Sequence, residues 1–216
     1  MNRDARVLRE LVSGHGRTFA EEAGIRLKDT PQPLYRLLVL SLLLSARIRA
    51  SVAVAAARAL HEDHLDGSPR RMAEADWRRR VEALGRGGYR RYDERTATQL
   101  GDGAELLDRR WGGDLRRLHR EAEGDAGTLR ELLQEAPGIG PAGAGIFLRE
   151  AQRVWPDVAP YLDGKALSGA GRLGLPEDPE KLTGLAGDTD PAVLAAALVR
   201  AALDEQVAED CLRRAG

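Results

Sequence analysis

This chain has little cysteine and few aromatic residues, and neither charge is in excess. Cys211 is the only cysteine among 216 residues, which excludes an internal disulfide and any zinc or iron–sulfur site built from cysteines alone. Aromatic residues make up only 4% of the chain, so its apolar content comes mainly from leucine, alanine and valine. Because leucine and alanine favour helices and β-branched residues are sparse, we expect an all-α fold.

The charges nearly cancel, with 33 basic residues, 34 acidic residues and a formal net charge of −1. A strongly basic balance would by itself indicate a nucleic-acid partner, so here any DNA-binding surface must be a local patch. Almost all of the basic residues are arginines, since the only lysines are Lys28, Lys165 and Lys181. Each lysine can therefore be considered individually for a chemical role.

Long hydrophobic runs are also missing. The longest apolar stretch, residues 37–46, contains two serines and is too short to cross a bilayer, which needs about 20 residues. The N-terminus lacks the apolar core of a signal peptide. We therefore expect a cytoplasmic protein, associated with the nucleoid if it binds DNA, and no membrane partner.

What is present is a succession of helical patterns with no strand pattern. The spacing of apolar residues, with capping residues and breakers, predicts helices over 3–14, 17–23, 34–45, 48–60, 68–75, 74–84, 93–107, 128–135, 142–154, 163–173 and 191–213. The segment 34–45 is apolar nearly all round, which predicts a fully buried helix. Residues 45–47 are predicted to form a corner between two helices. Residues 109–117 are left undecided because of a Gly-Gly break.

The most informative segment runs from Leu133 to Ala142 and has the form helix, Pro137-Gly138-Ile139-Gly140, helix. Two glycines one residue apart permit a tight turn and leave no side chain to block a close approach. Backbone N–H groups at the start of the second helix can then face a phosphate, and Ile139 would point inward. Such a helix-hairpin-helix grips the DNA backbone without reading its sequence; the alternative is an ordinary helical hairpin that uses glycine for turning.

The surrounding segments resemble one family. Leu42-Leu43-Leu44-Ser45-Ala46-Arg47 precedes the hairpin, and Tyr161-Leu162-Asp163-Gly164-Lys165-Ala166, Gly171-Arg172-Leu173-Gly174-Leu175 and Pro179-Glu180-Lys181-Leu182 follow it. Their order resembles the endonuclease III-like helix-hairpin-helix (HhH-GPD) superfamily of DNA glycosylases. The resemblance covers roughly residues 30–205 and is strongest over 133–182.

The resemblance implies a two-lobed all-α fold and a protein that flips a damaged base out of the duplex. It places Asp163 at the carboxylate that stabilises the developing oxocarbenium ion or helps to activate water. The alternative is that Asp163 merely caps the following helix, and the two roles are compatible.

The chain departs from the family pattern at its nucleophile. Bifunctional members carry a lysine two residues after the second hairpin glycine, and Ala142 occupies that position here. Loss of this amine removes the covalent nucleophile, so we expect water to attack instead. Lys165 is an alternative nucleophile, although side chains at i and i+2 on a helix diverge by about 200°. Its other interpretation is a solvent-exposed or phosphate-contacting lysine.

Other family features are absent or altered. With one cysteine there can be no iron–sulfur cluster, and we expect no cofactor, apart from room for a monovalent cation at the hairpin. Arg47 replaces the glutamine that fills the gap left by the flipped base, and its alternative role is a salt bridge at the corner. Arg86 and Tyr89 lie where the family places a wedge residue. Arg86, Arg90 and Arg91 are also candidate phosphate contacts, and their alternative is a solvated loop.

We therefore expect a central lobe at residues 30–135, a second lobe formed by 1–29 and 136–216, and a hairpin at 128–154. The expected function is that of a monomeric, monofunctional base-excision glycosylase. It would use Asp163 on double-stranded DNA that contains a damaged or mismatched base. Three alternatives remain: a non-catalytic DNA-binding descendant, a glycosylase with lyase activity through Lys165, and an unrelated helical protein–protein module.

Overall fold

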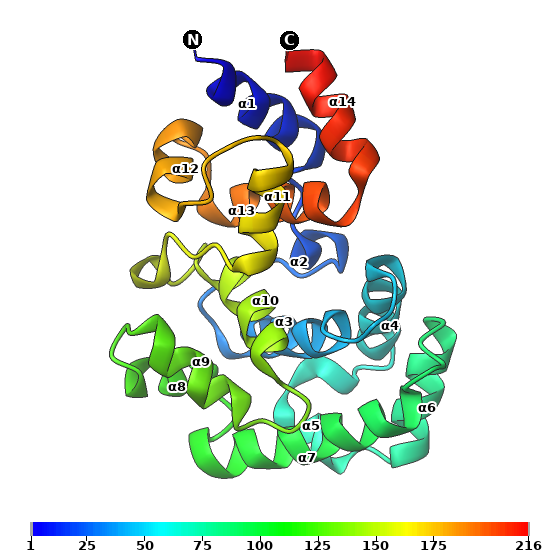
Figure 1. The fold of residues 1–216 in the computed structure, drawn as a ribbon. Helices are drawn as coiled ribbons and strands as arrows, with labels where there is room; N and C mark the ends of the chain where they lie inside the picture. The colour runs from blue at the N-terminus through cyan, green and yellow to red at the C-terminus, as the bar shows by residue number, and fades with distance from the viewer. Residues whose placement is uncertain (1, 216) are drawn as a thin grey trace. The chain divides into compact units, whose positions relative to one another are not determined.

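The computed structural model describes residues 2–215, which form helices joined by turns, with no strand among them (Figure 1). The prediction of an all-α fold is therefore confirmed. The chain folds into two compact units. We call Ala20–Leu148 the central unit, and we call the described residues of Met1–Phe19 and Arg149–Gly216 the terminal unit. The sequence pattern instead suggested boundaries at residues 29/30 and 135/136.

The central unit is built around one apolar helix. After α2 (Phe19–Glu22), its elements are α3 (Pro31–Leu44), α4 (Ala50–Glu62), η1 (Leu65–Gly67), α5 (Pro69–Glu74), α6 (Trp77–Arg86), α7 (Asp93–Trp111), α8 (Leu115–Glu121), α9 (Ala126–Gln134) and the start of α10 (Pro141–Ala151). Helix α3 packs against α4, η1 and α8. Its leucines at 34, 37, 40 and 43 have no exposed surface. The prediction of a fully buried helix is confirmed, as is the corner that follows it.

The terminal unit surrounds a second apolar helix. Its elements are α1 (Arg3–His15), the end of α10, η2 (Pro156–Val158), α11 (Gly164–Arg172), α12 (Pro179–Ala186), α13 (Pro191–Leu203) and α14 (Glu205–Ala215). Helix α13 packs against α1, α11, α12 and α14. Helices α1 and α14, at the two ends of the chain, lie side by side (Figure 1).

The structure corrects one predicted helix and assigns one segment that the sequence left undecided. The single helix predicted over 191–213 is wrong, because the chain breaks at Asp204, where φ is −134°. The Asp204 carboxylate accepts a hydrogen bond from the Gln206 amide at 2.9 Å and so caps the start of α14. The undecided segment 109–117 divides at Gly112, which ends α7 in the left-handed conformation before α8 begins at Leu115.

Apolar helix length is limited throughout residues 2–215. No single helix there is both long and apolar enough to cross a membrane. Helices α12 and α13 pass that test only together, and they are bent by 108° at the break between them.

Candidate nucleic-acid interface

The hairpin between α9 and α10 turns through a hydrogen-bonded β-turn. The amide of Ile139 donates to the carbonyl oxygen of Ala136 at 3.0 Å. Pro137 occupies the second position, and Gly138 occupies the third with φ of +88°, the arrangement of a type II turn. A Cβ atom on Gly138 would also lie 2.9 Å from Cδ1 of Leu42 and 3.0 Å from the side chain of Gln99. Both the turn and its packing therefore require the first glycine of the hairpin.

The second glycine of the hairpin has no such explanation inside the protein. Gly140 does not have a positive φ, and a Cβ atom built on it would meet nothing within 4 Å. Its carbonyl oxygen accepts the first bond of α10, from the amide of Ala144 at 3.0 Å. The absence of a side chain at this position therefore keeps the backbone open to a molecule from outside.

Backbone donors at the start of α10 are unpaired. Within residues 2–215, the amides of Gly140, Ala142 and Gly143 make no hydrogen bond. Pro141 and Ala142 are exposed, and the first turn of this 11-residue helix carries no acidic residue. Free N–H groups and the positive end of the helix dipole together suit a phosphate oxygen.

The turn is held on both sides. Ile139 is 4% exposed, as the inward orientation predicted from sequence requires. Helix α9 is capped by Asp125, whose carboxylate accepts from the amide and the hydroxyl of Thr128, both at 2.7 Å. The hydrogen bond from the Thr128 amide is the main reason that the pKa of Asp125 lies below its usual value. The unpaired amides therefore belong to a fixed turn.

The corner after α3 packs against the hairpin. A Cβ atom on Gly143 would lie 3.6 Å from Cβ of Ser45, and the Ser45 hydroxyl donates to the carbonyl oxygen of Leu42 at 2.7 Å. Arg47 is exposed and has no ion-pair partner within the described residues. The alternative prediction of a corner salt bridge is therefore wrong.

A cavity of about 390 Å³ lies beside the hairpin turn, within the central unit. Its lining includes Arg47, Tyr89, Tyr92, Arg95 and Gln99, together with Gly138 of the turn. The structure thus brings together Arg47, Tyr89 and Gly138, which were candidates from sequence. The others were missed, although their spacing of three and four residues is the signal for one helix face.

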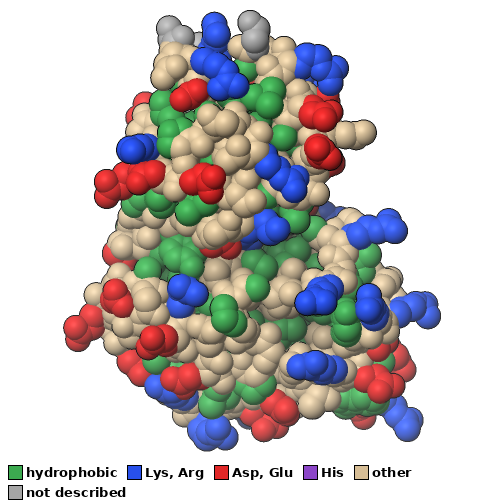
Figure 2. Space-filling view, in the orientation of Figure 1, with side chains coloured by type: hydrophobic (Ala, Val, Ile, Leu, Met, Phe, Trp, Pro, Cys, Tyr) green, Lys and Arg blue, Asp and Glu red, His purple; other side chains and the backbone are tan. Residues whose placement is uncertain are grey.

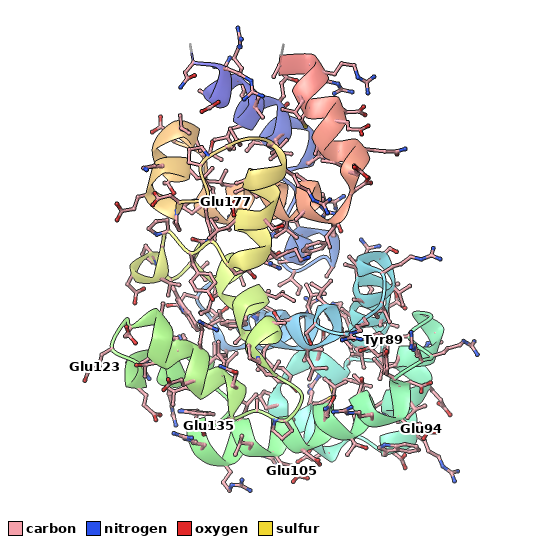
Figure 3. All side chains as sticks on the ribbon, in the orientation of Figure 1. Tyr89, Glu94, Glu105, Glu123, Glu135 and Glu177 are labelled. Atoms are coloured by element: carbon pink, nitrogen blue, oxygen red, sulfur yellow. The ribbon has the colours of Figure 1, made fainter. Side chains whose placement is uncertain are left out.

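The proposed wedge residues lie in different surroundings. Tyr89 is 1% exposed, and its hydroxyl accepts from the Thr96 hydroxyl at 3.4 Å (Figure 3). Burial raises the pKa of Tyr89. Because a wedge must project from the surface, the prediction of Tyr89 as a wedge is wrong. Arg86 is half-exposed and pairs with Asp63 at 2.5 Å.

Positive charge gathers on one side of the central unit. Figure 2 shows Lys and Arg side chains over α4 and α6, whereas acidic side chains gather over α8 and α9. Arg90 and Arg91, which precede α7, and Arg95, in its first turn, are exposed. The guanidinium carbon of Arg91 lies 5.2 Å from the centre of the Tyr92 ring, which is within range for a cation–π contact. Arg47 and Arg95 line the cavity beside the hairpin turn, so the nearly neutral chain has two arginines next to the turn.

In the terminal unit, Asp163 is engaged by its neighbours. Its Oδ1 accepts from the Ala166 amide at 3.0 Å, which caps α11. Nη1 of Arg149 donates to both carboxylate oxygens, at 2.8 and 3.1 Å. The Arg149 side chain is only 7% exposed and that of Asp163 is 19% exposed. Lys165 is exposed, two residues further along the same helix.

A buried glutamine fixes the loop that leads to Asp163. Oε1 of Gln152 accepts from the Tyr161 amide at 2.7 Å, and Nε2 donates to the carbonyl oxygens of Tyr161 and Arg149 at 3.0 and 2.8 Å. Gln152 is 2% exposed. Sequence reasoning missed both Arg149, near the end of α10, and Gln152, just after it; polar residues that directly follow an apolar helical run were the available signal.

No protein-family model matches this chain, and no curated protein sequence matches it. The class that the structure establishes is that of an all-α protein. What the hairpin and its surroundings do must therefore be inferred from their own chemistry.

Proposed function

We propose that this protein binds double-stranded DNA through its hairpin and acts as a monofunctional base-excision glycosylase. The observation that carries the proposal is the start of α10, where Gly140 leaves open space and three amides lack partners. A phosphate oxygen would satisfy such donors without any contact to a base, which gives binding that does not depend on sequence. Arg47 and Arg95, at the cavity beside the hairpin turn, support the same partner.

The proposed chemistry is hydrolysis of the bond between a damaged or mismatched base and its sugar. As the base leaves with the electrons of that bond, the sugar becomes cationic, and a nearby carboxylate lowers the barrier electrostatically. Asp163 is the proposed carboxylate, and its bonds to Arg149 and Ala166 hold it in one orientation. Water then adds to the sugar cation, and the proton that the water loses is transferred to the departing base. Ala142 stands where a lysine nucleophile would be needed for lyase chemistry.

The test is cleavage of duplex oligonucleotides that each carry one damaged or mismatched base. Each duplex is assayed with and without hot alkali, using the intact protein and the variant Asp163→Asn. Asparagine is also a good helix cap, but the variant loses the charge that pairs with the buried Arg149, so thermal unfolding must first show that it is folded at the assay temperature. We expect alkali-dependent cleavage of at least one lesion, lost in the variant, with unchanged DNA affinity.

A second function is favoured by one specific observation. Both oxygens of Asp163 are already occupied by Arg149 and Ala166, as they would be if the carboxylate were purely structural. The second candidate is therefore a non-catalytic DNA-binding protein. No cleavage of any lesion, combined with affinity that weakens as salt rises, would establish it in place of the glycosylase.

A further inference from the structure

Among the described residues, the charged side chains that line the cavity beside the hairpin are both arginines. Arg47 and Arg95 contribute to its wall and no acidic residue does. Within residues 2–215 neither arginine has an ion-pair partner. Two uncompensated cations at one cavity repel each other, and an anion between them would remove that cost.

The rest of the lining suits a base. The aromatic ring of Tyr92 offers a stacking surface, and the Gln99 amide offers both a donor and an acceptor. The volume of about 390 Å³ lies at the lower end of the range for small-molecule sites. It is therefore suited to a single nucleotide and excludes a stretch of paired DNA.

The position of the cavity indicates which nucleotide of a bound DNA could enter it. Gly138 lines the cavity and lies two residues before Gly140, at which we propose that a DNA backbone is held. This step rests on the proposed DNA binding. A nucleotide within an intact duplex must first be unstacked and unpaired before it can enter a concave site, whereas the end of an interrupted strand is free to do so.

The number of cations favours a terminal phosphate. A phosphomonoester carries a charge of about −1.5 to −2 at neutral pH, with three strong acceptor oxygens. We propose that this cavity binds the phosphorylated terminal nucleotide of a nicked or gapped DNA strand. Arg47 and Arg95 bind the phosphate, and Tyr92 and Gln99 contact the base.

The experiment measures the affinity of the full chain for duplexes of one sequence by fluorescence anisotropy. One duplex is intact, and three contain a one-nucleotide gap that ends in a 5′-phosphate, in a 3′-phosphate or in hydroxyl groups only. A fifth carries one extrahelical nucleotide without a break. We expect at least fivefold tighter binding to one phosphorylated gap than to the hydroxyl gap, and the two phosphate positions distinguish the strand ends.

Two arginine variants make the test specific to the cavity. Arg95→Gln should reduce the phosphate-dependent preference to less than twofold. Arg79→Gln removes the same charge from an exposed residue of α6 that does not line the cavity, and it should leave the preference intact. Thermal unfolding of both variants confirms that they are folded.

The outcomes separate this proposal from the proposed function. Equal binding of phosphorylated and hydroxyl gaps would overturn the terminal-phosphate proposal while intact-duplex binding still supports the hairpin. Equal binding of the extrahelical nucleotide and the phosphorylated gap would also overturn it, because an unpaired nucleotide would then suffice. Failure to bind any of the duplexes would overturn both.

Discussion

The start of α10 and the surroundings of Asp163 treat their polar groups in opposite ways. At the hairpin, the amides of Gly140, Ala142 and Gly143 have no partner within the described residues. At Asp163, the carboxylate accepts from Arg149 and Ala166. The first region therefore has backbone donors that are free to bind a ligand, whereas the carboxylate of the second is already paired within the protein.

The difference teaches where to look for binding and where to look for stability. Polar groups that the fold leaves unpaired at a rigid surface are available to a ligand at no cost in broken bonds. Groups that are buried and paired stabilise the fold only as long as both partners remain. The hairpin is therefore the better supported part of the proposed DNA-binding site, and the role of Asp163 must be separated from its structural contribution.

The largest effect that we expect comes from breaking the ion pair of Arg149. Arg149→Met would leave the Asp163 carboxylate without its buried partner, because the Arg149 side chain is only 7% exposed. We expect a loss of about 3 kcal/mol in the free energy of unfolding, which corresponds to a Tm lower by about 6–12 °C. Thermal and chemical denaturation would measure both.

The matched control is Arg3→Met, in the same unit. Arg3 pairs with Asp4 at 3.4 Å, and its side chain is 55% exposed. An exposed pair contributes at most about 1 kcal/mol, so this variant should unfold close to the unaltered protein. Equal loss in both variants would remove the distinction between a buried structural pair and a surface pair.

The next effect compares the two glycines of the hairpin. Gly138→Ala places a Cβ atom at φ +88° and within 3.0 Å of Leu42 and Gln99, so we expect a loss of about 2 kcal/mol. Gly140→Ala meets nothing within 4 Å and should cost less than about 1 kcal/mol. Urea denaturation would measure the free energy of unfolding of both variants. Comparable losses would mean that Gly140 has a structural role after all.

The smallest effect concerns acid stability of the first hairpin helix. The Thr128 amide holds the pKa of Asp125 below its usual value of 3.8, so the folded state favours the ionised cap. This contribution is present above the unfolded pKa and is lost as the pH falls through the lower folded pKa. Asp125→Asn keeps a cap without titrating, so its stability should fall less steeply between pH 5 and 3. An unchanged slope would contradict the capping account.

Local signals in the sequence predicted much of the fold. The apolar run 34–45 predicted the body of α3, although the helix begins three residues earlier, at Pro31. Pro137 and Gly138 predicted the position of the hairpin turn, because proline fixes φ and glycine permits the positive φ that the turn needs. The break at Asp204 was missed, since an aspartate within a helical pattern reads equally well as an exposed helix residue.

The candidate site was predicted less completely. Tyr92, Arg95 and Gln99 belong to one face of the segment that begins α7, but their meeting with Arg47 at one cavity depends on tertiary packing. The burial of Tyr89 has the same cause, because aromatic residues in loops occur both as exposed and as core side chains. Contacts between segments far apart in the sequence are the part that a single sequence does not specify.

The central claim is that the open backbone at Gly140 holds a DNA phosphate, and one pair of variants tests it most directly. Gly140→Asp and Gly140→Asn both place a good capping residue before α10, but only aspartate adds a negative charge. We predict that the unaltered protein binds an intact duplex with affinity that falls steeply with salt. We also predict that Gly140→Asp binds at least tenfold more weakly than Gly140→Asn, with both variants fully folded. Equal affinities for the two variants, or binding that is insensitive to salt, would contradict the account.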